Sequence, residues 1–405
     1  MTCCVYISSK RRFCSWPPLA GETVCGHHRQ ERVPCPLDPR HTVQASGLEA
    51  HLLVCPVAVT AQRQAASDYL CTDVNGGSDS EGESEAAREY ADGVWRCREG
   101  ELSWDCARCA VQSAVALISA STVSLQDLPP PADLPACVES AVTKAAAASG
   151  QPHASVPFEL RHAQQQAGIL AHAAAALLLP PTADVVYVEL GAGRGMLSAT
   201  LADAYSSEAV RLLLVERRAY RYKAERVLRR AANVSVRRLR CNIKDLDLTH
   251  APLPGDGPAR LVLLCKHLCG NATDAALRCG AACAAAGMLQ GGALATCCHH
   301  ACTWRDFCGK AQMRSLGFDA RSFSLACRIA SWAFDKAHEK DDGSDSRWGL
   351  TLEQRRAAGL AAKRLLDSAR VEWASQHCGV HASLVQFCQS GVSPENRLLV
   401  LSSKH

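Results

Sequence analysis

The sequence lacks any apolar run long enough to cross a bilayer. The longest run, near residues 167–181, is rich in alanine and is interrupted by His172, whereas a membrane-spanning helix needs about 20 apolar residues in succession. The first residues, MTCCVYISSKRRFC, also lack the apolar segment and small-residue cleavage site of a secretory signal. We therefore expect an intracellular protein, cytoplasmic or nuclear, with no membrane partner.

Cysteine, in contrast, is abundant. The 405 residues include 23 cysteines, and disulfides are rare in a reducing intracellular environment. The cysteines therefore favour metal ligation and buried thiols over a disulfide framework. The chain is long enough to form two or three domains.

The net charge of +4 hides an uneven distribution of charge along the chain. Residues 75–89, NGGSDSEGESEAARE, are acidic and nearly free of large apolar side chains, which predicts a disordered linker. Residues 211–240 instead hold eleven Lys or Arg residues against Glu216 and Glu225. This basic strip indicates a polyanionic partner.

The segment CPLDPRHTVQASGLEAHLLVC holds two cysteines and two histidines at spacings that suit a zinc module. Ser46 is placed to cap a short helix, and His51 and Cys55, four residues apart, would project from one face of that helix. Cys35 and His41 flank a proline-rich turn that can complete a tetrahedral shell. We favour zinc over a chance grouping, because about sixty residues with little apolar content need a bound metal or a covalent cross-link to fold.

A second set of possible ligands lies upstream, with a weaker spacing signal: Cys3, Cys14, Cys25 and His28. By spacing alone, Cys4 can replace Cys3 and His27 can replace His28. The segment therefore predicts a second zinc module whose exact ligands stay open at this point.

The stretch DVVYVELGAGRGMLSATLA predicts an apolar strand at residues 185–190, a glycine loop and the start of a helix. A dinucleotide-binding loop would need glycine at position 196, where the chain has Met196. The loop spacing is G-x-G-x-G, preceded by Glu189, and it resembles the first motif of class I S-adenosylmethionine-dependent methyltransferases. Its three glycines are Gly191, Gly193 and Gly195.

A second predicted strand, at residues 209–216, ends in Glu216. A carboxylate at this distance from a glycine loop can accept both ribose hydroxyls of a bound cofactor. The loop and Glu216 support each other as a cofactor site, and a dinucleotide-binding oxidoreductase is the alternative.

Beyond the glycine loop, stretches typical of strands alternate with stretches typical of helices. This alternation predicts an α/β, Rossmann-like domain with a doubly wound parallel sheet, whose ligands bind at the carboxyl ends of the strands. The motifs CKHLCG and CCHHAC each end a predicted strand, so they fall at the edge expected to hold the site.

The second of these motifs contains the consecutive residues Cys297, Cys298, His299 and His300. Successive residues of a strand point to opposite faces, so these four cannot all bind one ion while the chain is extended. At most the alternating set Cys298, His300 and Cys302 can converge, and it lacks a fourth ligand. We interpret the run as the wall of a cofactor or substrate site rather than a third zinc site.

The first motif contains Lys266 and His267. Methyltransferases that act on base amines usually have Asn/Asp-Pro-Pro-aromatic at this strand end, whereas a hydroxyl nucleophile needs orientation, a cation for the developing alkoxide, or a base. Lys266 suits the cationic role, and His267 can act as a base near neutral pH. A purely structural role, with Lys266 reaching solvent and His267 bonded beneath the loop, is the alternative.

These motifs occur in one order over nearly the whole chain: KRRFC, VCGHH, CPLDPRHTV, VELGAGRGMLS, CKHLCGNATDAALRC, CCHHAC and SPENRLLVLSS. In them the chain resembles the tRNA:m(4)X modification enzyme family. The resemblance implies a eukaryotic ribose 2'-O-methyltransferase that acts at position 4 of the tRNA acceptor stem.

The resemblance also implies roles for individual residues. It implies a CCCH-type finger and a CHHC finger, with the ligands Cys3, Cys14, Cys25, His28, Cys35, His41, His51 and Cys55. It places the loop from Glu189 to Gly195 against the cofactor. Relatives tend to have Asp where this chain has Asn242, which can still hydrogen-bond adenine. They have Arg and Asp where it has Ala301 and Thr303, which changes the contacts that this loop can make with substrate.

We accordingly predict zinc fingers at residues 1–30 and 31–58, an acidic linker and variable helical region at 59–150, and a methyltransferase domain at 151–405. The expected cofactors are S-adenosyl-L-methionine and two zinc ions, both in the N-terminal modules, and the expected partner is the tRNA acceptor stem. A non-catalytic zinc-finger RNA-binding protein is the alternative, against which the intact glycine loop and Glu216 argue.

Overall fold

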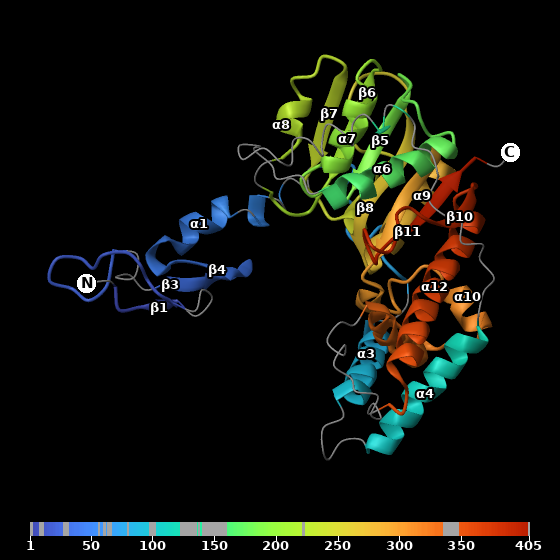
Figure 1. Cartoon of the computed structure of the whole chain (residues 1–405). Helices are drawn as coiled ribbons and strands as arrows, with labels where there is room; N and C mark the ends of the chain where they lie inside the picture. The colour runs from blue at the N-terminus through green and yellow to red at the C-terminus, as the bar shows by residue number, and fades with distance from the viewer. Residues whose placement is uncertain are drawn as a thin grey trace. The chain divides into compact units, whose positions relative to one another are not determined.

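The computed structural model divides into two units, Met1–Leu70 and Cys71–His405 (Figure 1). Its described residues are 3–7, 12–26, 32–55, 57–59, 62, 67–78, 81–96, 103–121, 136, 138–139, 160–220, 223–334 and 348–403.

The N-terminal unit consists of short strands and a helix. Strand β1 (Tyr6–Ile7) pairs with β2 (Arg12–Phe13), and β3 (Arg32–Cys35) pairs with β4 (Asp38–Gln44), both in antiparallel register. The 3-10 helix η2 (Ala45–Gly47) and helix α1 (Leu48–Val54) follow β4.

This unit buries almost no apolar side chain. In its described part, all of the buried residues are cysteines: Cys3, Cys14, Cys25, Cys35 and Cys55. A segment with so small a core depends on a metal or another staple for its fold.

The predicted cap of α1 is wrong. Ser46 lies within η2, and Gly47 precedes α1 without a side-chain hydrogen bond to its first turn. The rest of the helical prediction holds, because His51 lies on α1 and Cys55 directly follows it.

A seven-stranded sheet forms the centre of the larger unit (Figure 1). Its strands in chain order are β5 (Val185–Leu190), β6 (Val210–Val215), β7 (Val234–Leu239), β8 (Arg260–Cys269), β9 (Leu289–Cys297), β10 (His381–Gln386) and β11 (Arg397–Ser402). Their spatial order is β10-β11-β9-β8-β5-β6-β7, and β11 runs antiparallel to both of its neighbours while the other pairs are parallel. The predicted Rossmann-like α/β fold is confirmed.

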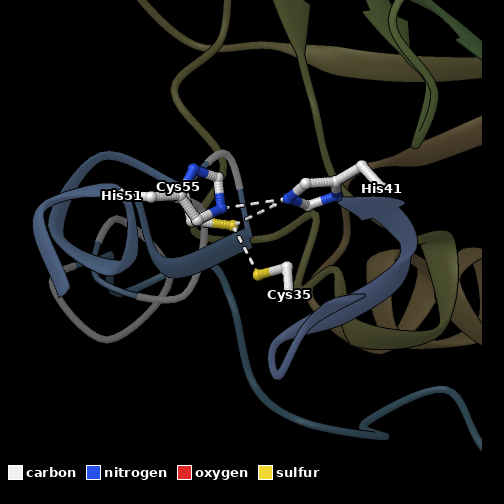
Figure 2. A group of neighbouring side chains, drawn as sticks. All are labelled: Cys35, His41, His51 and Cys55. Atoms are coloured by element: carbon white, nitrogen blue, oxygen red, sulfur yellow. Dashed lines mark hydrogen bonds between the residues drawn. The ribbon is translucent and has the colours of Figure 1, made fainter. Parts of the chain in front are cut away.

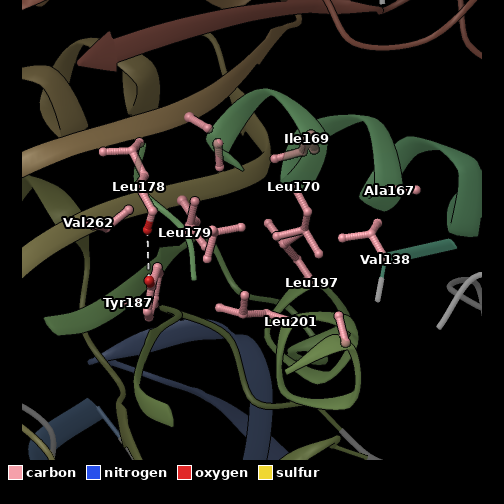
Figure 3. Close-up of a cluster of buried hydrophobic side chains, with 14 of the residues drawn as sticks. Val138, Ala167, Ile169, Leu170, Leu178, Leu179, Tyr187, Leu197, Leu201 and Val262 are labelled. Carbon is pink, nitrogen blue, oxygen red and sulfur yellow. Dashed lines mark hydrogen bonds between the residues drawn. The ribbon is translucent and has the colours of Figure 1, made fainter. Parts of the chain in front are cut away.

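Helices cover both faces of this sheet. Helices α6 (Leu160–Ala175) and α7 (Met196–Ala204) pack on the face that contains Tyr187 and Val262 (Figure 3). Helix α9 (Asn271–Ala285) packs on the other face, where Gly280 adjoins Leu263. Every residue of β5 is consequently buried, as expected for a central parallel strand.

The direction in which the chain adds strands to the sheet reverses at β5. β6 and β7 lie on one side of β5, and the next strand in the chain, β8, lies on its other side. Such a switch point separates the loops that leave neighbouring strands and opens a crevice at their carboxyl ends. Three short elements lie in the loops around it, namely α8 (Glu225–Leu228), η3 (Ile243–Asp245) and η4 (His299–Ala301).

A second hydrophobic core is formed mainly by helices (Figure 1). It joins α3 (Glu81–Arg96) and α4 (Trp104–Ala120) to α11 (Ala320–Ala330) and α12 (Leu352–His377). The short elements α10 (Lys310–Ser315) and η5 (Ser331–Phe334) lie between α9 and α12 in the chain.

The prediction that residues 75–89 are a disordered linker is wrong. Asn75 is buried, and its side-chain amide donates to the carbonyls of Ile243 and Leu246 at 2.8 and 2.7 Å. Most of the remaining acidic stretch lies in α3, whose buried residues Ala87 and Ala91 are four apart and face α11. The amino-acid composition of the stretch does not reveal the apolar face of α3, because the apolar side chains on that face are small.

A buried ionic network ties α12 to the loops that end β8 and β9. The Arg370 guanidinium lies 2.7 Å from Asp274 and 3.1 Å from Asp367, and none of the three side chains is exposed to solvent. Asp367 also accepts from Thr296 and contacts His299 at 2.8 Å. Burial alone raises the pKa of Asp367, but His299 and Arg370 lower it to about 2, so the carboxylate is charged.

We expect Arg370→Met to lower the free energy of unfolding by about 3–5 kcal/mol, because it removes the cation that pairs with the buried Asp274 and one of the partners of the buried Asp367. Urea denaturation followed by circular dichroism measures the change. Arg356→Met, at an exposed position on the same helix, is the control and should change stability by less than about 0.5 kcal/mol. Equal stability of the two variants would contradict a role for the network.

Candidate functional site

The CHHC residues converge in the structure (Figure 2). The sulfurs of Cys35 and Cys55 are 3.8 Å apart, and the Nε2 atoms of His41 and His51 are 3.0 Å apart. The Nε2 atom of His41 lies 3.9 Å from the Cys55 sulfur. Zinc with Zn–S and Zn–N bonds of about 2.3 and 2.0 Å holds tetrahedral ligand atoms about 3.3–3.8 Å apart. The four side chains therefore fit a zinc ion.

The upstream module also brings three sulfurs together. Cys3, Cys14 and Cys25 are buried, and their sulfurs lie within 4.8 Å of one another. Cys4 is exposed, so Cys3 rather than Cys4 belongs to this group. The predicted fourth ligand, His28, and its alternative, His27, lie outside the described residues.

A cavity of about 760 Å³ opens at the carboxyl ends of β5, β6 and β8. All but one of the predicted cofactor and catalytic residues line it, namely Glu189, Gly191, Gly193, Glu216, Asn242, Lys266 and His267. The predicted site residues that lie far apart in sequence thus meet at the switch point of the sheet.

Two glycines of the loop serve different purposes. Gly193 has φ of 51°, and a Cβ atom there would meet no atom within 4 Å, so the space in front of its backbone is open. Gly195 has φ of 81° and does not line the cavity, and a Cβ atom there would lie 2.5 Å from Leu214. Gly195 therefore permits close packing of the loop on β6 rather than contact with a ligand.

The backbone of Gly193 is held from both sides. Its N–H donates to the Glu216 carboxylate at 2.9 Å, and its carbonyl accepts from the Arg238 guanidinium at 3.0 Å. Arg238 is fixed in turn by a partly buried ion pair with Glu225. The second oxygen of Glu216 accepts from the backbone N–H of Arg218 at 2.8 Å.

Glu189 connects the strand before the glycine loop to the helix after it. One of its oxygens accepts from the backbone N–H and the hydroxyl of Ser198, at 3.0 and 2.5 Å, in the first turn of α7. Burial raises the pKa of Glu189 to about 7, and these two hydrogen bonds oppose the rise. Glu189 therefore holds the start of α7 and also lines the cavity.

Lys266 points toward a partner that sequence reasoning missed. Its ammonium lies 3.0 Å from Nδ1 of His162, which comes from α6. One turn later on α6, Gln166 lines the cavity and accepts from Thr200 at 2.8 Å. The sequence shows polar residues one turn apart in an alanine-rich helix, which indicates a polar face of α6 but not that His162 contacts Lys266.

His267 lies beside Lys266 at the cavity wall. Desolvation, and then the neighbouring positive charge of Lys266, lower the pKa of His267. The imidazole is therefore more often neutral than a histidine in water.

The basic strip does not form one surface. Arg211 is buried and donates to the carbonyls of Pro254 and Ala183 at 2.7 and 3.1 Å, and Arg238 on β7 donates to the glycine loop. Arg217 and Arg218 are exposed and line the cavity. The strip thus combines structural arginines with a small cationic rim.

The residues of the CCHH run have different surroundings. His299 is buried against Asp367, whereas His300 is exposed. Cys302 is buried, and its sulfur lies 3.1 Å from Arg370. The set Cys298, His300 and Cys302, which is the most that the strand argument allows to converge, is not among the groups of neighbouring metal ligands found in the described residues.

Comparison with known families adds to this geometry. The model of the family described as Methyltransferase TRM13 matches residues 164–402. The chain belongs to this family. A CCCH zinc finger in TRM13 protein matches residues 1–29, and a U11-48K-like CHHC zinc finger matches residues 32–56. The N-terminal unit thus contains the two predicted zinc fingers, and the oxidoreductase alternative is excluded.

Three curated relatives match nearly the whole of this chain. The mouse protein named tRNA:m(4)X modification enzyme TRM13 homolog is 28% identical over 100% of this chain and 94% of its own. The Eremothecium gossypii and human proteins of the same family name are 29% and 27% identical, covering 98% and 100% of this chain and 94% and 95% of theirs.

A solved structure also aligns with this chain. It is the plantazolicin methyltransferase BpumL in complex with SAH, with a TM-score of 0.29, 8% identity, and coverage of 73% of this chain and 99% of that one. That score is too low to support any inference. In the described part of this chain, no helix is both long and apolar enough to cross a membrane.

We expect Cys55→Ser and Cys14→Ser each to lower the bound zinc by one ion per chain, because each removes a ligand from one finger. Elemental analysis of the purified full-length protein measures the ratio. Cys4→Ser is the matched control and should leave it unchanged, since Cys4 is exposed and outside the sulfur group. A loss of zinc in Cys4→Ser, or none in Cys14→Ser, would contradict the ligand set.

Proposed function

We propose that this protein methylates tRNA, by transferring a methyl group from S-adenosyl-L-methionine to the ribose 2'-hydroxyl at position 4 of the acceptor stem. Membership of the TRM13 family and the names of the relatives support methylation of tRNA. The observation that carries the finer proposal is that an open glycine loop and Lys266 line one cavity.

The residues of the cavity fit this cofactor. The open space at Gly193 lets a ligand approach the backbone closely, and Glu216 lies beside it with a carboxylate that can accept ribose hydroxyls. Asn242 follows β7 and lines the same cavity, where its amide can hydrogen-bond adenine. When bound, the cofactor supplies an electrophilic methyl group.

The acceptor side of the cavity favours a hydroxyl over a base amine. Near its end β8 has Lys266 and His267 and not the Asn/Asp-Pro-Pro-aromatic sequence typical of base-amine methylation. A ribose hydroxyl is a weak nucleophile, so alignment and a nearby cation lower the barrier by stabilising the charge that develops on its oxygen. In this proposal Lys266 binds the hydroxyl oxygen, and His267 is the candidate to accept its proton.

His162 gives Lys266 a fixed position. An unsupported lysine has four rotatable bonds, and ordering it costs conformational entropy. The 3.0 Å contact between Nδ1 of His162 and the Lys266 ammonium holds the side chain across the cavity before substrate arrives. His162 is thus a positioning residue in this proposal.

The RNA side rests on charge and shape. Arg217 and Arg218 are exposed at the cavity rim, where they can contact phosphates next to the target ribose. Side chains cannot read the narrow major groove of A-form RNA, so an acceptor stem would be recognised through its backbone and its shape. The two zinc fingers would supply further contacts of this kind.

We expect Gly193→Asp to abolish S-adenosylmethionine binding in calorimetry, because the new side chain occupies the open space before the loop. Gly257→Asp is the matched control. Its φ of 86° gives a similar backbone strain, its Cβ also meets nothing within 4 Å, and it does not line the cavity. Unchanged affinity in Gly193→Asp would remove the loop from the proposed site.

We expect Lys266→Met to lower the single-turnover rate of methyl transfer to tRNA about 10²- to 10⁴-fold, the range of one positioned catalytic group. Cofactor affinity should hardly change, because Lys266 acts on the hydroxyl. Lys223→Met is the control, since Lys223 does not line the cavity. A near-normal rate of methyl transfer in Lys266→Met would show that Lys266 has only a structural role at the end of β8.

The alternative, a non-catalytic RNA-binding protein, makes a different prediction. It requires tRNA binding without any transfer of label from methyl-labelled S-adenosylmethionine. Transfer by the wild-type chain, lost in Gly193→Asp and retained in Gly257→Asp, would exclude it.

A further inference from the structure

Three cysteines outside the zinc fingers meet beside the cavity. The sulfurs of Cys269, Cys297 and Cys298 lie within 4.8 Å of one another, and those of Cys269 and Cys297 are 3.6 Å apart. All three are free thiols. They come from the carboxyl ends of the neighbouring strands β8 and β9, where the register pairs Cys269 with Cys297.

Two adjacent cysteines can face one point here because β9 ends between them. Cys298 has φ of 52° and ψ of 43°, in the left-handed region, and η4 begins at the next residue. Alternation of side chains applies only to extended chain, so it stops at Cys297. The strand argument against a metal site in this run therefore does not apply beyond Cys297, and the side chains of Cys297 and Cys298 can face one ion.

The bend at Cys298 is fixed from both sides. On one side, the Gly270 N–H donates to the carbonyl of Cys297 at 3.2 Å, which keeps the two strand ends together. On the other, His299 is buried against Asp367. A left-handed non-glycine residue costs about 1–2 kcal/mol, and these contacts offset that cost.

The sulfur spacing matches that of the CHHC finger in the same chain. Cys269 and Cys297 are separated by 3.6 Å, and Cys35 and Cys55 by 3.8 Å. Tetrahedral zinc with Zn–S bonds of about 2.3 Å needs sulfurs about 3.8 Å apart. A disulfide would need about 2.05 Å, so the thiols are spaced as ligands and not as a bonded pair.

We propose that Cys269, Cys297 and Cys298 bind a third zinc ion. Three thiolates are a ligand set that suits zinc and other thiophilic cations rather than magnesium or calcium. Cys269 lines the cavity while Cys297 is buried. The fourth position therefore faces the cavity and is filled by water, as in sites with three protein ligands.

The ion joins two strand ends that form one wall of the cavity. β8 carries Lys266 three residues before Cys269, and Asn271, two residues after it, holds the loop beyond η4 through both the backbone and the hydroxyl of Thr303. Binding releases protons from the thiols, so zinc affinity rises with pH. The site is independent of the substrate proposed above, because it rests only on the three sulfurs.

The test is zinc content per chain in the full-length protein. We expect three ions in the wild type, one in the double variant Cys14→Ser/Cys55→Ser, and none when Cys269→Ser is added to that pair. Cys109→Ser is the matched control at an exposed cysteine of α4 and should leave the wild-type ratio unchanged.

Cobalt substitution gives a second readout. In the Cys14→Ser/Cys55→Ser background, bound Co²⁺ should show a thiolate charge-transfer band that disappears with Cys298→Ser, even if Cys269→Ser fails to fold. Two zinc ions in the wild type and none in the double variant would overturn the proposal. A disulfide between Cys269 and Cys297 in zinc-saturated protein, found by mass spectrometry, would overturn it as well.

Discussion

The two hydrogen bonds that hold the backbone of Gly193 are the constraint on which the cavity depends. Glu216 at the end of β6 accepts the N–H, and Arg238 from β7 donates to the carbonyl. The loop at the end of the central strand β5 is thereby fixed by its two neighbours on one side of the switch point. β8 lies on the other side of β5 and contributes Lys266 to the wall of the cavity.

Local patterns predicted the parts of this site that are local. The strand at 185–190, the glycine spacing and Glu216 each have a signal within a few residues, and the structure places them together. His162 lies 104 residues from Lys266, and a single sequence contains no signal for such a pair. Gly195 shows the limit of a motif, since its spacing matches but its space is occupied by Leu214.

The differences between the structure and the sequence-based expectations have physical causes as well. The acidic stretch forms α3 because small side chains such as Ala87 and Ala91 suffice to pack against α11. The basic strip does not act as one surface, because Arg211 and Arg238 donate to backbone carbonyls within the protein instead of facing a polyanion. At Cys298, the alternation of side chains no longer applies, because β9 ends at Cys297, the first residue of the run of ligand-type residues.

Identification of the methylated atom tests the central claim most directly. Transfer RNA incubated with the protein and labelled S-adenosylmethionine is digested to nucleosides and to fragments, and each is analysed by mass spectrometry. The account predicts one label per acceptor stem, on the ribose of the nucleotide at position 4. Label on a nucleobase, or at another position, would contradict it.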